Sequence, residues 1–288
     1  MKGLLRRALP ERARLALRRS GRLRWITKAR NLRKTGPGPW RGRPLKIASF
    51  VLLDPEVDTY TYRIENDREL AEGLAGLLGS PHEEVQALLS EAQGDSELGE
   101  RLTRDIGWRV LFYKRRPALD GHHLSAYAIV RTLGPEVAVE TGILEGLGSR
   151  TILRALQRNA EDGRDGHLWS FDIVRGAGAL VPERLATRWT PLYEPSEEGL
   201  PRLLAERTVG FFIHDSLPDP EHQRRELATA IDRARPGAVV MTVHGWSGVL
   251  QELAQERDLS YAEFRERPHD HFYGGRHLAW ARVPAEPD

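Results

Sequence analysis

The sequence predicts an α/β protein built on a mostly parallel sheet, and three observations lead to this fold class. Short apolar segments alternate with helical ones from Val137 onward, as in repeated strand–helix–strand units. A glycine-rich turn directly follows the first apolar segment, the place where such a sheet binds nucleotide-like ligands. The last two apolar segments have no helical segment between them, so they are expected to form an antiparallel hairpin at the sheet edge.

Seven strands and four crossover helices follow from this pattern. Helices are expected at 149–158, 199–206, 221–234 and 248–256. The polar loop 268–275 joins the last two strands. The parallel strands are expected at 137–140, 168–172, 190–193, 210–214 and 238–243, and the hairpin strands at 260–265 and 277–283.

The chain is expected to have three regions. Residues 1–46 are a basic arm with a linker rich in glycine and proline, 47–120 a helical cap region, and 121–288 the ligand-binding domain. Within the cap region, 47–53 is a strand candidate, whereas 65–93 and 98–113 have helical periodicity. A helix at 124–133, opened by His122-His123, leads into the first strand.

Charge is distributed very unevenly along the chain. Residues 1–46 carry a net charge of +15, and the remaining residues carry −13. A basic arm can bind nucleic acid or an anionic membrane, but the favoured interpretation is an arm that docks on its own acidic domain or on a second copy. The aromatic residues that single-strand binding needs are few in the arm, with Trp25 and Trp40 alone.

Composition excludes several classes of protein. The chain contains no cysteine, which rules out a disulfide framework, a thiolate zinc site and a cysteine nucleophile. No apolar run approaches the roughly 18 residues that span a bilayer, and the N-terminus lacks the apolar region of a signal peptide. We therefore expect a soluble, cytoplasmic protein.

The glycine turn has a specific spacing. Glu140 ends the first strand, and Gly142, Gly146, Gly148 and Ser149 follow. This spacing fits neither the dinucleotide fingerprint nor a phosphate-binding P-loop. It resembles the first motif of class I S-adenosylmethionine-dependent methyltransferases, and the parallel sheet closed by a hairpin resembles their Rossmann-like architecture. The resemblance implies an enzyme that uses S-adenosyl-L-methionine.

The same resemblance assigns the cofactor-binding residues. The amino acid end of the cofactor would lie against the motif, at Glu140, Thr141, Gly142, Gly146 and Ser149. Asp172, at the end of the second strand, would accept hydrogen bonds from the ribose hydroxyls, although an acid at a strand end can also be a simple surface residue. Glu140 could likewise be only a partner of the helix dipole. The loop after the third strand would place Ser196 beside the adenine.

A second run, from Val209 to Leu217, indicates a subgroup within this family. It contains Phe-Ile-His-Asp-Ser-Leu and resembles bacterial macrocin-type sugar O-methyltransferases, as do segments 180–189, 200–204 and 235–237. In that group the acid at Asp215 lies where the methyl group meets the acceptor, and two further acids after the fifth strand complete a divalent metal site. Here Val243-His244 stands in their place. A magnesium site is therefore not favoured.

The replaced acids lead to a mechanistic hypothesis. His214, Asp215 and His244 are expected at neighbouring strand ends, so His244 or His214 would remove the acceptor proton, with Asp215 as the orienting acid. His214 can equally be a buried structural residue. The run Pro268-His-Asp-His271 has too few ligands for a metal site and is interpreted as a polar loop.

The predicted function is therefore O-methylation of a small-molecule hydroxyl, on a sugar or a natural-product scaffold of secondary metabolism such as antibiotic biosynthesis. A nucleic-acid methyltransferase that uses the basic arm is one alternative. It is disfavoured because the sequence lacks the Asn/Asp-Pro-Pro-aromatic run of many base-methylating enzymes. A non-catalytic module that binds the cofactor is the other alternative. The identity of the acceptor and a homo-oligomeric state stay open.

Overall fold

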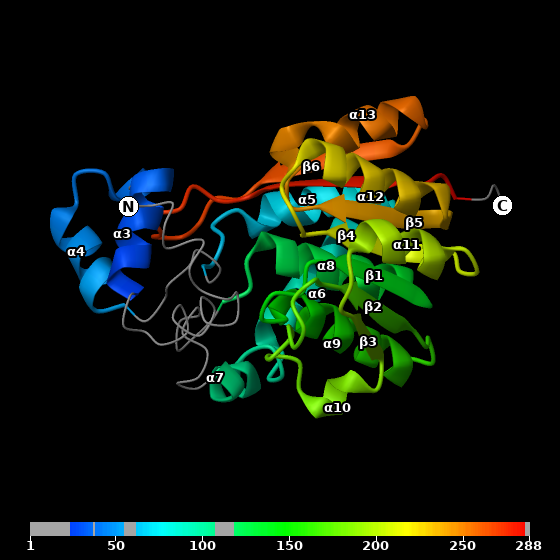
Figure 1. Cartoon of the computed structure of the whole chain (residues 1–288), viewed down its shortest axis with the longest axis horizontal. Helices are drawn as coiled ribbons and strands as arrows, with labels where there is room; N and C mark the ends of the chain where they lie inside the picture. The colour runs from blue at the N-terminus through cyan, green and yellow to red at the C-terminus, as the bar shows by residue number, and fades with distance from the viewer. Residues whose placement is uncertain (1–23, 37, 55–61, 107–117, 286–288) are drawn as a thin grey trace.

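The computed structural model describes residues 24–36, 38–54, 62–106 and 118–285. Within these residues, seven strands form one sheet of order β3-β2-β1-β4-β5-β7-β6 (Figure 1). Strands β1 to β5 are parallel, and β7 runs antiparallel to both β5 and β6. The strands are β1 (Val137–Thr141), β2 (His167–Phe171), β3 (Trp189–Leu192), β4 (Val209–His214), β5 (Ala234–Thr242), β6 (Ser260–Arg265) and β7 (His277–Arg282). The expected Rossmann-like sheet with a C-terminal hairpin is confirmed.

The order of the strands places a ligand site between β1 and β4. The chain leaves β1 toward β2 and β3 on one side, and β4 and β5 then add to the other side. Thr141 is in register with Phe171 of β2 and with His214 of β4, so these three strands end level with one another. Open α/β sheets bind their ligands in the crevice at this switch point.

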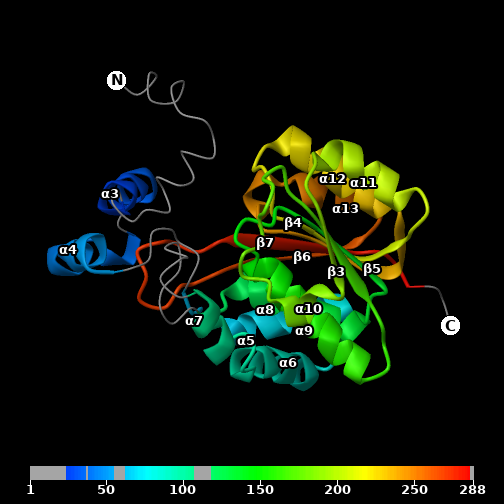
Figure 2. The same ribbon diagram turned by 60° about the horizontal axis from the view of Figure 1, so that its bottom comes forward.

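Helices cover both faces of the sheet (Figure 2). One face carries α8 (Gly121–Leu133) and α9 (Leu147–Glu161), together with α5 (Asp67–Leu78) and α6 (His82–Gly94). The other face carries α11 (Ser196–Leu204), α12 (Pro220–Asp232) and α13 (Val249–Glu256). The short helices α7 (Glu100–Ile106) and α10 (Glu183–Ala186) complete this region.

Two hydrophobic cores result, one on each face. Along β4, Phe211 and Ile213 enter the core beneath α8 and α9, whereas Phe212 enters the core beneath α12. This alternation follows from the period of two in a strand, and the near-continuous apolar sequence follows from cover on both faces.

The helices of the expected cap region belong to the main core. Both α5 and α6 pack on α8, and α5 also packs on the β6–β7 edge. The leucines of the two helices share one buried cluster with the sheet. Arg282 of β7 donates a hydrogen bond to the Leu77 carbonyl of α5 at 3.2 Å. These two helices therefore extend a layer along the face of the sheet. The remainder of the helix expected at 98–113, beyond Ile106, lies outside the described residues.

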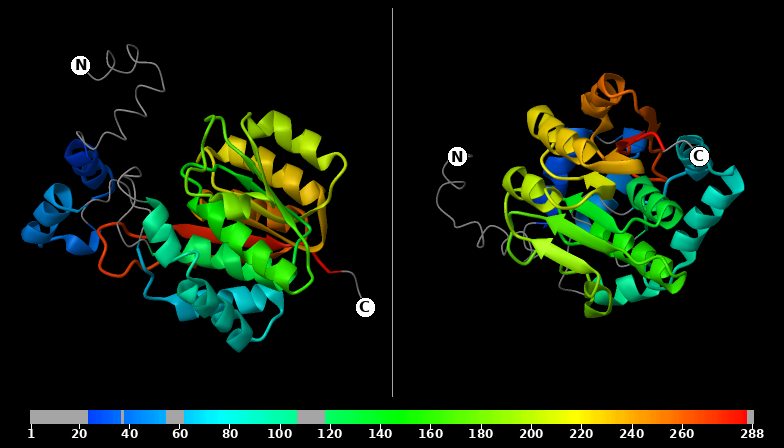
Figure 3. Two further views of the ribbon diagram at one scale, coloured as in Figure 1. Left: turned by 90° about the horizontal axis from the view of Figure 1, so that it is seen from below. Right: turned by 90° about the vertical axis from the view of Figure 1, so that its right-hand side faces the viewer.

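The N-terminal helices α3 (Arg24–Thr35) and α4 (Pro44–Leu52) lie beside the β6–β7 loop at one end of the molecule (Figure 3). The short helix η1 (Gly38–Trp40) brings Trp40 into an aromatic cluster with Phe50 and Phe272. The ring centroids in this cluster are 4.7–5.7 Å apart. The segment expected as a linker is therefore anchored through Trp40. Residues 1–23 of the basic arm lie outside the described residues.

The strand predicted at 47–53 is wrong, because this segment is helical in α4. Pro44 stands in the first turn, where its missing N–H costs nothing. Ile47, Phe50 and Val51 then recur at helical spacing and pack in the aromatic cluster. A short apolar run has no periodicity that separates a buried strand from a helix, which explains the error. No helix in the described ranges is long and apolar enough to cross a membrane.

Candidate active site

The turn after β1 brings two strand ends into close contact. Gly142 has φ of +92°, and a Cβ there would lie 2.3 Å from the Asp215 carbonyl oxygen. The backbone N–H of Asp215 donates to the Thr141 carbonyl at 2.9 Å. Gly146, with φ of +90°, forms the N-cap of α9. Glycine at position 142 therefore allows the loops after β1 and β4 to touch, whereas glycine at position 146 allows the turn to approach Gly178 in the segment after β2.

Glu140 is buried beneath the first turn of α9. Ser149 donates a side-chain hydrogen bond to its Oε2, and a Cβ on Gly148 would lie 2.8 Å from its Oε1. Burial raises the pKa of Glu140 to about 8, although the hydrogen bonds from Ser149 and Ser170 oppose this shift. A cationic group placed beside it would favour the ionised form. Gly148 is thus the residue that lets this carboxyl approach the helix.

Asp172 supports the turn from the end of β2. Its Oδ2 accepts hydrogen bonds from the backbone N–H groups of Ile143 and Leu144, each at 3.0 Å. Its Oδ1 accepts one from Val174 at 2.8 Å. An ionised carboxylate offers about four acceptor positions, so it retains room for a further donor. The structure thus places the expected ribose acceptor directly against the glycine turn.

A buried hydrogen-bond network joins the ends of β1, β3 and β4 on the face of the sheet that α12 covers. Glu226 of α12 accepts hydrogen bonds from Thr141 at 2.7 Å and from Ser196, and its Oε2 lies 2.6 Å from His214 Nδ1. Burial alone would raise the pKa of Glu226, but hydrogen bonds with His214 and His222 hold it well below its usual range. The network therefore contains an ionised carboxylate in hydrogen-bond contact with an imidazole.

Asp215 was the acid expected to orient His214. In the structure, the carboxylate that contacts His214 is that of Glu226 instead. Consecutive residues at a strand end point to opposite faces, so Asp215 cannot lie on the same side as His214. Sequence reasoning missed Glu226. Its signal was an acid within the apolar stripe of α12, where Leu227, Ala230 and Ile231 are buried.

His244 follows β5 and lies beside His214. The two ring centroids are 5.4 Å apart in an edge-on arrangement. His214 Nε2 and His244 Nδ1 are both buried, and neither has a hydrogen-bond partner among the described residues. Burial lowers the pKa of His244 to about 3, and the neighbouring His214 and Arg276 side chains act in the same direction. His244 is therefore neutral near neutral pH.

A second polar cluster lies at the start of α8, on the other face of the sheet. It contains Asp120, His122 and His123, all of them buried. Asp215 faces this cluster, with its Oδ2 4.0 Å from His122 Nε2 and its Oδ1 3.8 Å from a guanidinium nitrogen of Arg276. Sequence reasoning treated the two histidines only as the opening of a helix.

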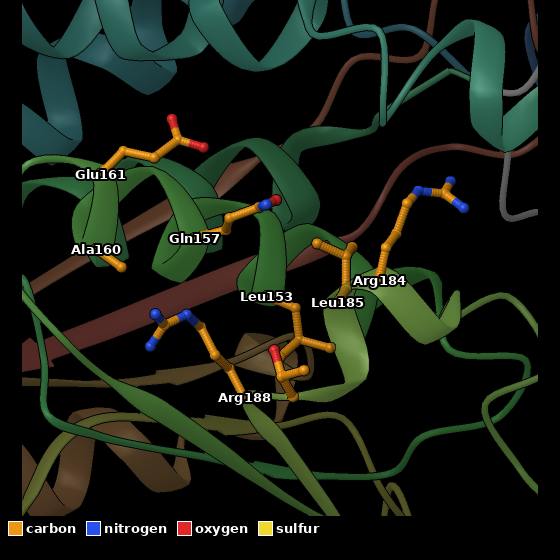
Figure 4. Close-up of a pocket in the computed structure, with 8 residues that line it drawn as sticks. Leu153, Gln157, Ala160, Glu161, Arg184, Leu185 and Arg188 are labelled. Carbon is orange, nitrogen blue, oxygen red and sulfur yellow. The ribbon is translucent and has the colours of Figure 1, made fainter.

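Two other features lie outside this site. The pocket in Figure 4 holds about 330 Å³ between α9 and α10, toward the end of α9 that is far from the glycine turn. In the β6–β7 loop, His269 pairs with Glu65 and Asp270 with Lys46, so the two side chains do not converge on a common ligand. His271, the third member of this run, is instead buried against Trp40 and Phe272.

Residues 139–244 match the model of a family described as a methyltransferase domain. The match begins in β1 and ends at His244, so it includes the glycine turn, Asp172, Asp215 and Glu226. This match supports the methyltransferase activity that the sequence predicted.

Two solved structures are similar to this chain at low sequence identity. The first is the O-methyltransferase TomG from Streptomyces achromogenes, involved in tomaymycin synthesis and determined with S-adenosylmethionine. It is 18% identical at a TM-score of 0.49, over 66% of this chain and 91% of that one. The second is an O-methyltransferase from Bacillus cereus in complex with S-adenosylhomocysteine. It is 14% identical at a TM-score of 0.48, over 68% of this chain and 96% of that one. No curated protein sequence matches this chain. At these values the likeness carries no argument about substrate.

Proposed function

We propose that this chain transfers a methyl group from S-adenosyl-L-methionine to a hydroxyl of a small molecule. The observation that carries the proposal is the glycine turn at the switch point of the sheet, held by Asp172 and placed in contact with the loop of Asp215. The methyltransferase-domain match over residues 139–244 supports the reaction class. The cofactor supplies an electrophilic methyl group on a sulfonium centre.

The residues around the turn fit such a cofactor. Gly142 and Gly146 allow the tight turn with positive φ that would face the cofactor, and the buried Glu140 offers a carboxyl to an ammonium group. Asp172 keeps acceptor capacity for ribose hydroxyls. Thr141 and Ser196, both tied to Glu226, would line the remaining wall with their backbone.

On the acceptor side, a chain of polar groups can take up a proton. With its Nδ1–H donating to Glu226, His214 presents Nε2 as an acceptor, and His244 Nδ1 is the neighbouring nitrogen that lacks a partner. A hydrogen bond between these two rings would connect Glu226 to the outer nitrogen of His244. In this scheme, His244 receives the acceptor proton, and His214 with Glu226 stabilises the charge. Alignment of hydroxyl and sulfonium supplies much of the rate.

The acceptor class rests on the resemblance of residues 209–217 to macrocin-type sugar O-methyltransferases. A sugar or a natural-product scaffold with a free hydroxyl is therefore the proposed acceptor. Val243 and His244 stand where that group has two acids, so the reaction is proposed to proceed without a metal ion at that position.

Calorimetry with S-adenosylhomocysteine tests the cofactor site. We expect one molecule to bind per chain, and Asp172→Ala to weaken binding at least about tenfold, since it removes both the turn support and the ribose acceptor. Asp165→Ala, on an exposed loop before β2, is the matched control and should bind as the native chain does. Absence of binding to well-folded native protein would refute the proposal.

Transfer of labelled methyl groups to a panel of hydroxylated sugars and scaffolds tests the reaction. His244→Ala should lower kcat while leaving the affinity for the cofactor unchanged. An unchanged kcat would remove His244 from the mechanism, and binding without transfer to any acceptor would favour a non-catalytic module.

A further inference from the structure

Three side chains at the start of α8 converge on one point. Asp120 Oδ1 lies 2.5 Å from His122 Nδ1 and 2.8 Å from His123 Nδ1. One donor atom from each residue falls within 4.8 Å of the other two. The two imidazole rings lie side by side, with centroids 3.7 Å apart. Helical spacing thus brings a carboxylate and two imidazoles together from four consecutive residues.

These groups are buried, and two of their atoms lack partners. Asp120 is fully buried, and each histidine is 3% exposed. Asp120 Oδ2 and His122 Nδ1 make no hydrogen bond in the described part of the chain. His122 Nδ1 nevertheless lies only 2.5 Å from Asp120 Oδ1. Buried polar atoms are almost always satisfied, so two such atoms without a hydrogen-bond partner in one small cluster call for a ligand.

The charge around this point is unbalanced. Asp120, Asp215 and Glu266 surround it, while Arg276 is the cation beside them, 3.8 Å from both Asp120 and Asp215. If all three carboxyl groups are ionised, the single guanidinium leaves a net charge of about −2 that a bound cation would neutralise.

The second nitrogen of His122 also has a suitable neighbour. His122 Nε2 lies 4.0 Å from Asp215 Oδ2. Histidines that bind metals usually direct their other ring nitrogen toward a carboxylate or a carbonyl, which fixes the ring. Two imidazoles with one carboxylate suit Zn²⁺, Mn²⁺ or Fe²⁺ better than Mg²⁺ or Ca²⁺, which prefer oxygen ligands.

We propose that Asp120, His122 and His123 bind one divalent transition-metal ion, with His122 linking the ion to Asp215. This site is distinct from the acid pair that residues 243–244 lack, and it does not depend on the proposed methyl transfer. The ion would satisfy Asp120 and His122 and fix Asp215 at the end of β4.

A purely structural explanation exists for one of these contacts. Asp120 accepts a hydrogen bond from the backbone N–H of His123 at 3.4 Å, as the N-cap of α8. The ring of His123 also forms a hydrogen bond with Asp120 Oδ1 at 2.8 Å, so the cap and this pair account for His123 but leave the close approach of His122 Nδ1 unexplained. Asp120→Asn keeps the cap and the size of the side chain but removes its charge, which separates the two roles.

The test uses the full chain after removal of metal with a chelator. We expect calorimetry with Zn²⁺ to give one ion per chain, and Co²⁺ to give visible absorption bands of nitrogen and oxygen coordination. Mg²⁺ at the same concentration should not bind. His123→Gln and Asp120→Asn should each weaken Zn²⁺ binding at least tenfold, whereas His269→Ala, an exposed histidine, should leave it unchanged.

Two results would overturn the proposal. One is native protein that binds no stoichiometric Zn²⁺, and the other is equal Zn²⁺ affinity in the native chain and in both cluster variants. Circular dichroism and a titration with S-adenosylhomocysteine on the same samples report whether each variant is folded. Zn²⁺ binding without cofactor binding would support the metal site while refuting the proposed function, so the two failures are distinguishable.

Discussion

The buried carboxyl of Glu140 makes folding stability depend on pH. Burial raises its pKa to about 8 from an ordinary 4.5. The folded chain thus keeps a proton that the unfolded chain loses above pH 4.5, and stability falls as the pH rises between these values. The slope is about 1.4 kcal/mol per pH unit, so about 2.5 kcal/mol disappears between pH 5 and pH 7. The full loss approaches about 5 kcal/mol above pH 8.

Glu140→Gln removes this titration and keeps the shape of the side chain. Guanidinium unfolding at pH 5, 6, 7 and 8 gives the free energy of unfolding for each protein. The difference between variant and native chain should shift in favour of the variant by about 2.5 kcal/mol from pH 5 to pH 7. Glu136→Gln, an exposed acid just before the same strand, is the control. Parallel pH profiles for the native chain and Glu140→Gln would refute the reasoning.

Three further predictions concern the framework of the site. Arg150 is fully buried and makes four hydrogen bonds to Glu97, Asp105 and the Leu180 carbonyl. Arg150→Met should lower the free energy of unfolding by about 3–5 kcal/mol in chemical denaturation, because the buried carboxylate of Glu97 loses a partner. Gly142→Ala should destabilise the fold by about 1–3 kcal/mol more than Gly163→Ala. Both glycines have positive φ, but a Cβ on Gly142 would clash with the Asp215 carbonyl, whereas one on Gly163 meets open space. Equal losses of stability in the two variants would contradict this clash. The ¹H NMR titration of His222 should have its midpoint at about 9, raised by its hydrogen bond to Glu226, and Glu226→Gln should move it toward 6.5. The stability from this pair is present below pH 6.5 and lost as pH rises through 9, so an unshifted midpoint in the variant would exclude the pair.

Most of the sheet could be predicted because its strands are bounded by strong local signals. Each of three buried apolar runs ends at a recognisable polar or glycine-rich signal: the Gly142–Gly148 turn, Asp172, and the His214-Asp215 pair. The helix at α4 was missed because a seven-residue apolar run is ambiguous without its partners. Its helical face is defined by Trp40 and Phe272, residues that only the folded chain brings together.

The site was predictable where it depends on one loop, and not where it depends on two faces of a sheet. The residues of the turn and Asp172 are indeed brought together. The carboxylate beside His214 comes from α12, 12 residues later, and the partners of Asp215 come from the start of α8. No local sequence pattern indicates which distant helix packs on which side of a strand end. The roles of Glu226 and Asp120 could therefore not be predicted from the sequence.

The aromatic cluster of Trp40, Phe50 and Phe272 has a consequence for the chemistry at the strand ends. Phe272 belongs to the same loop as Glu266 and Arg276, which surround Asp120 and Asp215. Residues 24–36 and 38–54 therefore pack, through this cluster, against the loop that carries these charges. Their removal would expose Phe272, so a shortened chain is expected to keep its sheet while the guanidinium of Arg276 shifts away from Asp120 and Asp215.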